Sequence, residues 1–580
     1  MDRIRLKIVG QSGAGLLSTG ELVVRALKEM GYHIVADREY PSLIKGGHSC
    51  FIINASMEEI RGFSSETDVM VAIDRPSLFA YFDQLKKGGI LVHGYDRVQG
   101  IEPILKKARA RKVKVIGVAT RALAEAQGGN YLMVNVVLAG MIWKVFGFDY
   151  KYIKKSVEVE FADKPKLLAI DLKCVKAGFD AAETVKELPE PSAANKKRVR
   201  KMKLVDGNQA VALGAIHAGV RTYFAYPMSP SSSILTNLAK WSGKTGMIVK
   251  QCEDEITVAN MALGAMYMGS RALCATSGGG YDLMTETVSL AGITETPLVV
   301  VLCQRPGPGT GLPTWTCQSD LNLAIYSSHG EFPKVVIALS HPEDAFDLTQ
   351  HALNIAEKYQ CVVILLSEKV ICEAKWSVDA FKQKKISIQR GIISGAALEK
   401  LESRDRYKIS KSGLSKRWLP GSSDAYYFAN GDEHWEDGEL TEDAIPAREM
   451  YAKRMRKLKT IQEILPEPEI FGVKKDADIS FVGWGSTKNV IHDVIETAKK
   501  RGVKVNYLHY SYVWPLKVEL ARKFCQENAN LHIIDGNYTG QFAQLFEAEV
   551  KHFAKGYLRK WDGRPFYIEE LETYIKQHGK

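Results

Sequence analysis

The sequence of 580 residues contains no two cysteines close enough to form a C-x-x-C motif. Its nine cysteines are scattered, at positions 50, 174, 252, 274, 303, 317, 361, 372 and 525. Zinc ribbons and ferredoxin-type clusters need closely spaced cysteines, so this spacing argues against both kinds of site in the chain. We expect scattered, reduced and buried thiols, and any iron–sulfur chemistry would need another chain.

Long hydrophobic runs are also absent. No stretch of about 18 apolar residues occurs, which argues against a membrane-spanning helix. The first residues, MDRIRLKIVGQSGAG, lead directly into a strand-and-glycine pattern and lack the layout of a signal peptide. We therefore expect a cytoplasmic protein with no membrane partner.

Excess positive charge is concentrated in one short segment. The formal net charge is +11, and a dense basic run, KKRVRKMK at 196–203, follows the proline-containing segment 187–191. No aromatic residue interleaves with these charges, as binding to single-stranded nucleic acid would favour. We interpret the run as a solvated linker between domains and expect no nucleic-acid partner.

The chain is too long for one hydrophobic core, and its 46% hydrophobic and 25% charged residues are ordinary globular values. Short apolar runs alternate with helical stretches, which predicts α/β domains with mostly parallel sheets covered on both faces. We predict an α/β domain at 1–185, the basic linker at 186–203, a second α/β domain at 204–380, an irregular segment at 381–465 and a third α/β domain at 466–580. The strands expected in the second domain are 222–226, 247–250, 271–276, 298–304, 334–337 and 361–366.

A glycine-rich loop, Gly10-Gln11-Ser12-Gly13-Ala14-Gly15, lies between the first predicted strand and helix. Backbone N–H groups at such a junction can hold a phosphate or pyrophosphate, although tight packing of the turn explains the glycines equally well. The spacing is neither a Walker motif nor a complete dinucleotide fingerprint, and the expected acidic residue is not cleanly placed at a strand end. The adjoining stretch 38–48 could hold a phosphorylated cofactor tail or form a polar turn.

Four stretches of the second domain are expected to lie at strand ends. The first, 226–234 (YPMSPSSSI), combines two prolines with several hydroxyls above the carboxyl edge of the sheet. The second is the acidic triplet 253–255, which could instead stabilise a helix dipole. The third, 276–281 (TSGGGY), is a permissive turn, and the fourth, 305–314 (RPGPGTGLPT), places an arginine beside hydroxyls, as suits a substrate carboxylate. Each alone is also compatible with a purely structural turn.

In order and spacing these stretches resemble the alpha region of the 2-oxoacid:ferredoxin oxidoreductases, with its Y-P-x-T-P-S-S, E-D-E, T-S-G-x-G and R-x-G-P-S-T-G-L-P-T. G-Q-S-G-A-G and Y-P-S-L-I-K-G-G-H resemble the fused gamma region of that family. G-D-E-H-W-E-D-G-E-L-T-E-D resembles its connecting segment, and I-D-G-N-Y-T-G-Q its last domain. The resemblance implies a gamma-type α/β domain, a pyrimidine-binding α/β domain of a thiamine enzyme and a transketolase C-terminal-like α/β domain.

The resemblance also implies a catalytic glutamate. Such enzymes use a glutamate to protonate the aminopyrimidine of thiamine diphosphate, and it tends to lie nine residues before a helix glycine. Glu255 and Gly264 have this spacing, so we favour Glu255 over Glu253 and expect it in a desolvated setting. Tyr226 and Pro227 would belong to the same cofactor-binding edge.

The substrate residues implied by the resemblance are Ser229, Arg305 and Thr314. Ser229 matches a motif threonine whose hydroxyl meets the 2-oxoacid, and the other two match a clamp on its carboxylate. The sequence departs from the family at two positions, because a serine replaces that threonine and Gly309 stands where serine is usual. These departures could shift the substrate range.

The diphosphate half of a thiamine site is missing from the sequence. The usual G-D-G motif is absent, and the nearest approach is Gly431-Asp432-Glu433. The resemblance therefore implies a separate beta subunit that carries the diphosphate, Mg²⁺ and an iron–sulfur cluster. The expected reaction is oxidative decarboxylation of a 2-oxoacid with coenzyme A, giving acyl-CoA, carbon dioxide and reduced ferredoxin, with the gamma-like region as the candidate for coenzyme A.

Two alternatives remain. The first is a flavin- or nicotinamide-dependent oxidoreductase that uses the N-terminal loop, which would leave the stretches between 226 and 314 unexplained. The second is a non-catalytic or divergent paralogue that serves as a scaffold in such a complex. The departures at Ser229 and Gly309 favour this second alternative, whereas the joint presence of Glu255, Arg305 and Thr314 argues against it.

Overall fold

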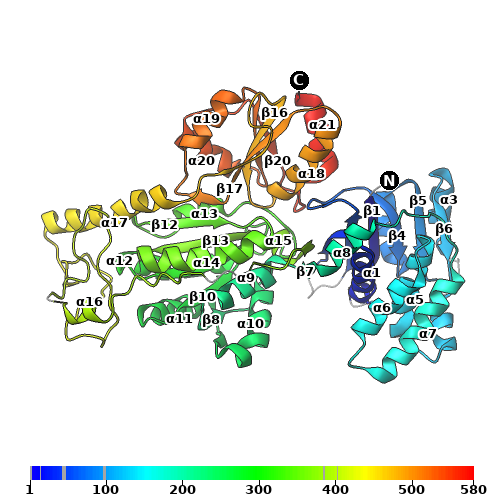
Figure 1. Ribbon diagram of the computed structural model, residues 1–580, viewed down its shortest axis with the longest axis horizontal. Coiled ribbons are helices and arrows are strands. Elements are labelled where there is room, and N and C mark those ends of the chain that lie inside the picture. Colours follow the sequence, from blue (N-terminus) through cyan, green and yellow to red (C-terminus); the bar gives the residue numbers. More distant parts are fainter. Residues whose placement is uncertain are drawn as a thin grey trace. The chain divides into compact units, whose positions relative to one another are not determined.

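The computed structural model describes residues 3–12, 15–41, 47–95, 100–382, 386–401 and 403–579. The chain divides into two compact units. The first comprises residues 1–205 with the segments 374–380 and 567–570, and the second comprises 206–373, 381–566 and 571–580. Both units consist of sheets flanked by helices (Figure 1), which confirms the predicted α/β class.

The first unit contains an eight-stranded sheet with the order β6-β5-β4-β1-β3-β2-β14-β7. One half is parallel, because β1 pairs with β4, β4 with β5 and β5 with β6. This half follows the predicted alternation of strands and helices. The strands are β1 Arg3–Gln11, β2 His33–Glu39, β3 His48–Ser56, β4 Thr67–Ala72, β5 Leu85–His93, β6 Lys114–Gly117, β7 Lys203–Val205 and β14 Lys375–Val378.

The other half of this sheet is antiparallel, so the prediction of a mostly parallel sheet was wrong here. β3 pairs antiparallel with β1 from Arg3↔Ser56 to Gln11↔His48, and also with β2. The link between β2 and β3 is too short for the crossover helix that parallel neighbours require. β14 comes from the region predicted to belong to the second domain, yet it pairs with β2 and β7.

The helices of the first unit include one inside the predicted linker. α8 begins after its cap Ser192, packs against α1 and buries Val199, while Arg200 Nε donates to the carbonyl of Glu29 (2.7 Å). Part of the basic run is therefore a packed helix. The helices are α1 Leu16–Met30, α2 Arg75–Tyr81, η1 Phe82–Gln84, α3 Glu102–Ala110, α4 Thr120–Ala126, η2 Tyr131–Met133, α5 Val134–Val145, α6 Tyr150–Glu160, α7 Pro165–Ala181 and α8 Ala193–Lys201.

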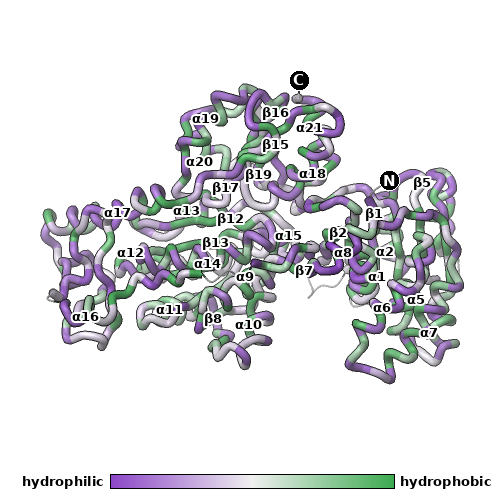
Figure 2. Tube along the Cα trace, in the orientation of Figure 1, coloured by the Kyte–Doolittle hydropathy of each residue, from purple (hydrophilic) through white to green (hydrophobic). Residues whose placement is uncertain are grey.

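The second unit contains a seven-stranded sheet with the order β18-β12-β13-β11-β10-β8-β9. Its strands are parallel except β18, which is antiparallel to β12. The hydrophobic (green) colour of β12 and β13 in Figure 2 is typical of strands buried on both faces. The six predicted strands occur as β8 Thr222–Ala225, β9 Ile248–Gln251, β10 Ala272–Thr276, β11 Leu298–Gln304, β12 Lys334–Ala338 and β13 Val362–Glu368, and β18 is Tyr512–Trp514.

The helices of this part connect successive strands. α11 packs against β8 and β10, α12 against β11 and β13, and α14 against α9. The helices are α9 Gly207–His217, α10 Ser232–Thr245, α11 Glu255–Tyr267, α12 Gly278–Ile293, α13 Leu321–Tyr326, α14 Pro342–Tyr359 and α15 Lys369–Glu373.

A five-stranded sheet, with the order β15-β17-β16-β19-β20, completes the second unit. Its hydrophobic core is continuous with that of the seven-stranded sheet: one cluster includes Val300 and Leu366 together with Val482 and Leu508. The two sheets therefore share one core. The elements are β15 Glu469–Gly472, β16 Ile479–Trp484, β17 Val505–Tyr510, β19 Leu531–Asp535, β20 Gly556–Arg559, α18 Thr487–Lys500, α19 Glu519–Glu527, α20 Gln541–Val550 and α21 Ile568–His578.

The predicted irregular segment has little regular structure before the long helix α17 (Ala444–Ile464, yellow in Figure 1), apart from the short α16 (Ala396–Glu399). α17 contains the predicted basic helix. Its buried residues are Met450, Lys453, Arg454, Lys457 and Ile461, which have the spacing of one helix face. Three of these five residues are basic, so this face needs buried partners for its charges.

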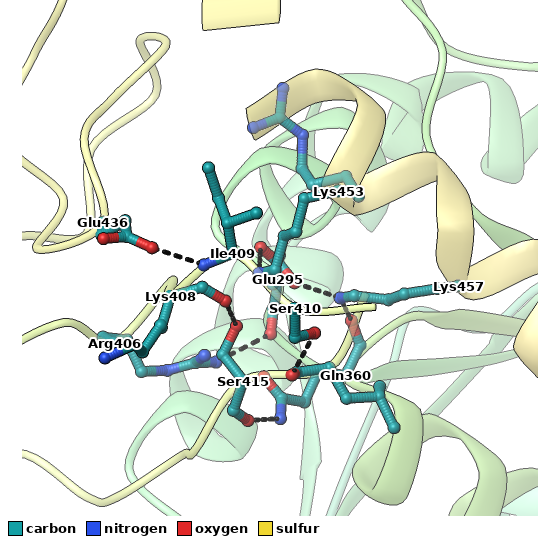
Figure 3. Close-up of polar contacts among 12 residues, drawn as sticks. Glu295, Gln360, Arg406, Lys408, Ile409, Ser410, Ser415, Glu436, Lys453 and Lys457 are labelled. Carbon is teal, nitrogen blue, oxygen red and sulfur yellow. Dashed lines mark hydrogen bonds and ion pairs between the residues drawn. The ribbon is translucent and has the colours of Figure 1, made fainter. Parts of the chain in front are cut away.

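Glu295 is the main partner of these charges (Figure 3). Lys453 Nζ donates to its Oε1, and Lys457 Nζ forms an ion pair with its Oε2. Lys457 also donates to the carbonyl of Gln360 (2.9 Å), and Arg406 donates to the carbonyl of Glu295 (3.2 Å). Burial would raise the pKa of Glu295, but the two lysines lower it. Glu295, Lys453 and Lys457, called the Glu295 cluster below, fasten α17 to this unit.

The remaining sequence predictions on composition have clear outcomes. All nine cysteines are free and buried, as predicted, although they lie in helices and loops as well as in strands. No helix in the described ranges combines the length and the apolar character that crossing a membrane requires.

Candidate active site at the carboxyl edge of the seven-stranded sheet

Four loops meet at one edge of the seven-stranded sheet. β9, β8, β10 and β11 are neighbours and run parallel, so their carboxyl ends lie side by side. The segment 226–231 follows β8, Glu255 opens α11 after β9, the glycine turn Thr276–Tyr281 follows β10, and the loop 305–314 follows β11. Ligands of parallel α/β sheets bind at this edge. The fold thus brings the four predicted stretches together.

The three acidic residues at the start of α11 have different surroundings. Glu253 is exposed, and Asp254 is the N-cap, whose carboxylate accepts the N–H of Thr257 (2.7 Å). Glu255 is 3% exposed, and its Oε1 is buried with no hydrogen-bond partner in the described part of the chain. Leaving a buried carboxylate oxygen without a donor is costly, so this atom marks a place where a ligand donor fits.

The glycine turn lets helix α12 approach two carboxyl groups. A Cβ at Gly280 would lie 2.1 Å from Thr276 Oγ1 and 2.7 Å from Glu255 Oε1. A Cβ at Gly278 would lie 2.7 Å from Oδ2 of Asp320. All three distances are shorter than a real Cβ contact, so a larger residue at either position would have to displace these side chains. The turn therefore contacts both the Glu255 and the Asp320 carboxyl groups.

Arg305 connects two of the four loops. Its Nη1 donates to the carbonyl of Ser229 (2.9 Å), which ties the loop after β11 to the loop after β8. Burial lowers the pKa of the half-buried guanidinium, whereas Asp320 and Glu255 raise it, and an arginine keeps its charge under these conditions. The structure thus places a cation and the Ser229 backbone together at this edge.

The other predicted residues of this edge differ in exposure. Thr314 is buried at 5% exposure, in the same loop as Arg305. Tyr226 and Pro227 are exposed on the loop after β8. Tyr226 and Pro227 can therefore contact a ligand or a second chain above the sheet, whereas the Thr314 side chain is largely shielded from solvent.

Asp320 is a residue of this edge that the sequence did not indicate. It is the N-cap of α13, but its side chain makes no capping hydrogen bond within the described structure. Its Oδ2 is buried and has no partner among the residues described, and the same holds for Oγ of Ser277 in the glycine turn. Burial and the nearby Asp282 raise the pKa of Asp320 to about 7, and Arg305 opposes them. An aspartate before a short helix is a common N-cap, so its residue type alone does not indicate this setting.

The loop between Thr314 and Asp320 is held by the five-stranded sheet, which the sequence also did not indicate. Gln318 Nε2 donates to the carbonyl of Trp484 (3.0 Å), and Gln318 Oε1 accepts the N–H of Gly536 (2.7 Å). Asn537 Nδ2 donates to the carbonyl of Gln318 (2.8 Å), and Gln541 Nε2 to that of Ser319 (2.8 Å). The stretch IDGNYTGQ therefore positions the loop next to Asp320.

The N-terminal glycine loop lies in the first unit and has a packing explanation for one glycine. Gly10 is part of β1, and Gly13 lies outside the described residues. Gly15 has φ of 77°, and a Cβ there would lie 1.6 Å from Nδ2 of Asn135, so this position requires glycine. Gln11 N–H already donates to Oδ2 of Asp74. A phosphate-binding role for this loop remains a prediction.

Two family models match the chain. A model described as pyruvate flavodoxin/ferredoxin oxidoreductase, thiamine diphosphate-binding, matches residues 213–453. A model described as pyruvate ferredoxin/flavodoxin oxidoreductase matches residues 5–181. The first match contains all four loops of the candidate active site, and the second covers most of the first unit.

Similar proteins cover the chain from end to end. The alpha subunit of a 2-oxoacid:ferredoxin oxidoreductase from Sulfolobus is 31% identical over 99% of this chain and 96% of its own length. The 2-oxoglutarate oxidoreductase subunit KorA from Mycobacterium tuberculosis is 27% identical over 99% of this chain and 91% of its own length. A solved structure, 2-oxoglutarate:ferredoxin oxidoreductase from Magnetococcus marinus with 2-oxoglutarate, coenzyme A and succinyl-CoA bound, matches with a TM-score of 0.90 and 27% identity over the whole of both chains.

Proposed function

The chain belongs to the alpha-subunit family of the 2-oxoacid:ferredoxin oxidoreductases, and we propose that it provides the pyrimidine-binding half of a thiamine diphosphate site. The reaction would be oxidative decarboxylation of a 2-oxoacid with coenzyme A, giving acyl-CoA, carbon dioxide and reduced ferredoxin. One observation carries this proposal. Oε1 of Glu255 is buried at the edge where the four loops meet, and it has no hydrogen-bond partner among the described residues. The thiamine diphosphate-binding family model covers the same residues.

The residues at this edge fit the cofactor. Glu255 would hold its aminopyrimidine ring, because a ring nitrogen supplies the hydrogen-bonding partner that Oε1 lacks among the described residues. When bound, thiamine diphosphate supplies the carbon nucleophile and electron sink that decarboxylation needs. Glu255 would hold and pass the proton at Oε1, shielded from water by its burial. The lack of a side chain at Gly280 leaves room for that atom beside the glycine turn.

The substrate would be a 2-oxoacid whose carboxylate binds to Arg305. The guanidinium can form a bidentate hydrogen bond with a carboxylate, and its Nη1 already donates to the Ser229 carbonyl, which orients the group. The hydroxyls of Ser229 and Thr314 would complete the contact. Gly309 is exposed and has φ of 61°, a backbone conformation that disfavours serine, so the loop as it stands favours glycine at this position. The bound 2-oxoglutarate in the Magnetococcus marinus enzyme makes this dicarboxylate the first candidate to test.

A beta subunit would supply what this chain does not. The nearest approach to a diphosphate motif, Gly431-Asp432-Glu433, has a structural role, because Glu433 accepts both guanidinium arms of Arg454 (Nη1 at 2.8 Å). We assign the diphosphate, Mg²⁺ and the iron–sulfur cluster to that partner and electron delivery to a ferredoxin. The first unit, with its glycine loop at Gly10 and Gly15, is the candidate site for coenzyme A, which is bound in the Magnetococcus marinus enzyme.

The test uses the neighbouring glutamates as a matched pair. The chain is co-expressed with a beta subunit, and anaerobic, coenzyme-A-dependent reduction of a viologen dye is measured with 2-oxoglutarate, pyruvate, branched-chain and aryl 2-oxoacids. Glu255→Gln should lower kcat at least about 100-fold, the usual range for loss of a positioned proton donor. Glu253→Gln removes the same charge from an exposed position two residues away and should retain activity within about twofold.

Two results would contradict the proposal. One is an assembled complex that binds thiamine diphosphate but reduces the dye with none of these 2-oxoacids, which would favour a divergent, non-catalytic paralogue. The other is equal loss in both glutamine variants, which would show that the local charge matters and not the buried carboxyl of Glu255.

A further inference from the structure

Asp320 lies at the candidate active site with an oxygen that nothing in the described structure satisfies. Its backbone N–H donates to Gln304 Oε1 (3.0 Å), which fixes it to the residue immediately before Arg305. Its Oδ2 faces the backbone of Gly278 in the glycine turn, where a Cβ would lie only 2.7 Å away. The side chain is thus held between the loop of Arg305 and the turn that also borders Glu255, and it gives up the capping bond that an N-cap aspartate normally makes.

The surroundings of Asp320 disfavour its charged form. The charged and titratable groups that face it are Asp282 on α12, Arg305 after β11 and the buried thiol of Cys317. Burial and Asp282 raise its pKa to about 7, with Arg305 opposing. A carboxyl group that keeps its proton is a hydrogen-bond donor as well as an acceptor.

A bound 2-oxoacid would shift this balance further. Its carboxylate would bind to Arg305, the cation whose charge favours ionisation of Asp320. Two carboxylates in one partly desolvated site cannot both stay ionised at low cost, so one of them takes up a proton. The proton comes from solvent, is held on Asp320, and returns to solvent when the product leaves.

We propose that Asp320 binds the 2-oxoacid as a neutral carboxyl group whose Oδ2–H donates to the substrate, so that substrate binding near neutral pH is coupled to proton uptake. The inference rests on the proposed function and adds to it a substrate-binding residue and a pH dependence. Asp320 contributes to binding and not to the decarboxylation step, so the effect is expected in KM and not in kcat.

The kinetic test compares the wild-type complex with Asp320→Asn and Asp282→Asn from about pH 6 to about pH 8.5. In the wild type, KM for the 2-oxoacid should rise above the pKa of Asp320, approaching tenfold per pH unit because only the protonated form binds well. Asp320→Asn keeps a neutral donor and should make KM nearly independent of pH. Asp282→Asn removes a neighbouring negative charge, so the same rise should persist but begin at lower pH.

A second readout does not depend on turnover. Heats of 2-oxoacid binding to the complex are measured by calorimetry at about pH 7.5 in two buffers with different ionisation enthalpies. The wild type should take up a measurable fraction of a proton per substrate bound, and Asp320→Asn should take up none. Thermal melting of the isolated chain checks that both asparagine variants fold.

The outcomes separate this inference from the proposed function. A complex that is active and sensitive to Glu255→Gln, but whose KM has the same pH profile in wild type and Asp320→Asn, overturns the role of Asp320 alone. Equal proton uptake by both proteins overturns it as well. A complex without activity toward any 2-oxoacid overturns the proposed function first.

Discussion

Two buried polar clusters of the second unit contain similar side chains but differ in whether their charges have partners. In the Glu295 cluster the carboxylate contacts Lys453 and Lys457, and all three side chains are at most 1% exposed. At the candidate active site, Glu255 Oε1, Ser277 Oγ and Asp320 Oδ2 are buried without a partner among the described residues. A cluster whose charges form ion pairs rigidifies a fold, whereas unpaired atoms that converge on one sheet edge indicate a missing ligand. Direct ion pairing, more than burial, separates structure from function here.

The largest expected effect is at the paired cluster. Glu295→Gln leaves two buried ammonium groups without a counter-charge and should lower the free energy of unfolding by about 3–5 kcal/mol. The check is hydrogen exchange of the α17 amides as a function of urea in the isolated chain. Replacing Lys453 and Lys457 by methionine together with Glu295→Gln should recover much of this loss, because the two ammonium groups are removed together with their counter-charge. If Glu295→Gln alone were as stable as wild type, the Glu295 cluster would not stabilise the fold.

The next effect is at the glycine turn. Gly280→Ala would place a methyl group against Thr276 Oγ1 and Glu255 Oε1 and should destabilise the chain by about 1–3 kcal/mol, as overpacking does. It should also weaken binding of thiamine diphosphate by the complex, measured by fluorescence titration. Gly279→Ala is the control, because nothing lies within 4 Å of a Cβ there. Equal effects of the two variants would show that the turn only needs flexibility and not space for Glu255.

A smaller effect concerns pH. The folded chain holds the proton of Asp320 up to about pH 7, whereas the unfolded chain releases it near about pH 4. Folding stability contributed by this group is therefore present at low pH and falls as pH rises from about 4 to about 7. Asp320→Asn removes this pH-dependent loss of stability. The thermal midpoint of the variant relative to wild type should therefore increase from about pH 4 to about pH 7, corresponding to a difference in unfolding free energy of the order of 1–2 kcal/mol. A constant difference between the two proteins would show that folding does not raise the pKa of Asp320.

The smallest expected effect on stability is at Glu255, and it tests most directly whether Glu255 differs from Glu295. Glu255→Gln should change the stability of the isolated chain by less than about 1 kcal/mol, because its Oε1 has no donor to lose within the described structure. The same variant should lose most of its activity in the complex. Urea unfolding of wild type and variant measures the first quantity. A large destabilisation would mean that Glu255 supports the fold, as Glu295 does.

Much of the second unit could be predicted from local patterns. The six strands predicted between 222 and 366 occur, and their ends differ from the predicted ends by at most two residues. The prediction succeeds because buried parallel strands consist of continuous runs of apolar residues. The four stretches from 226 to 314 were assigned to strand ends, and parallel pairing then carries them to one edge. The resemblance to the oxidoreductase family rested on these stretches and is confirmed by relatives that match end to end.

Other features depended on partners far away in the sequence. The basic helix α17 gave no sign that Lys453 and Lys457 would be buried, because Glu295 lies 158 residues before Lys453. The antiparallel half of the first sheet needed the pairing of β3 with β1 and β2, which alternation with helices does not indicate. β14 joins that sheet from beyond residue 373.

The sequence by itself determined the α/β class, the strands of the central sheet and the family, because side-chain alternation and motif spacing are local properties of the chain. Only the tertiary structure decided which buried charges are paired. It placed the Asp320 carboxyl group beside Gly278 without a partner among the described residues, and it buried basic residues of α17 against Glu295. The reason is physical: the cost of burying a polar atom depends on what lies within hydrogen-bond distance in space, and no local pattern records that distance.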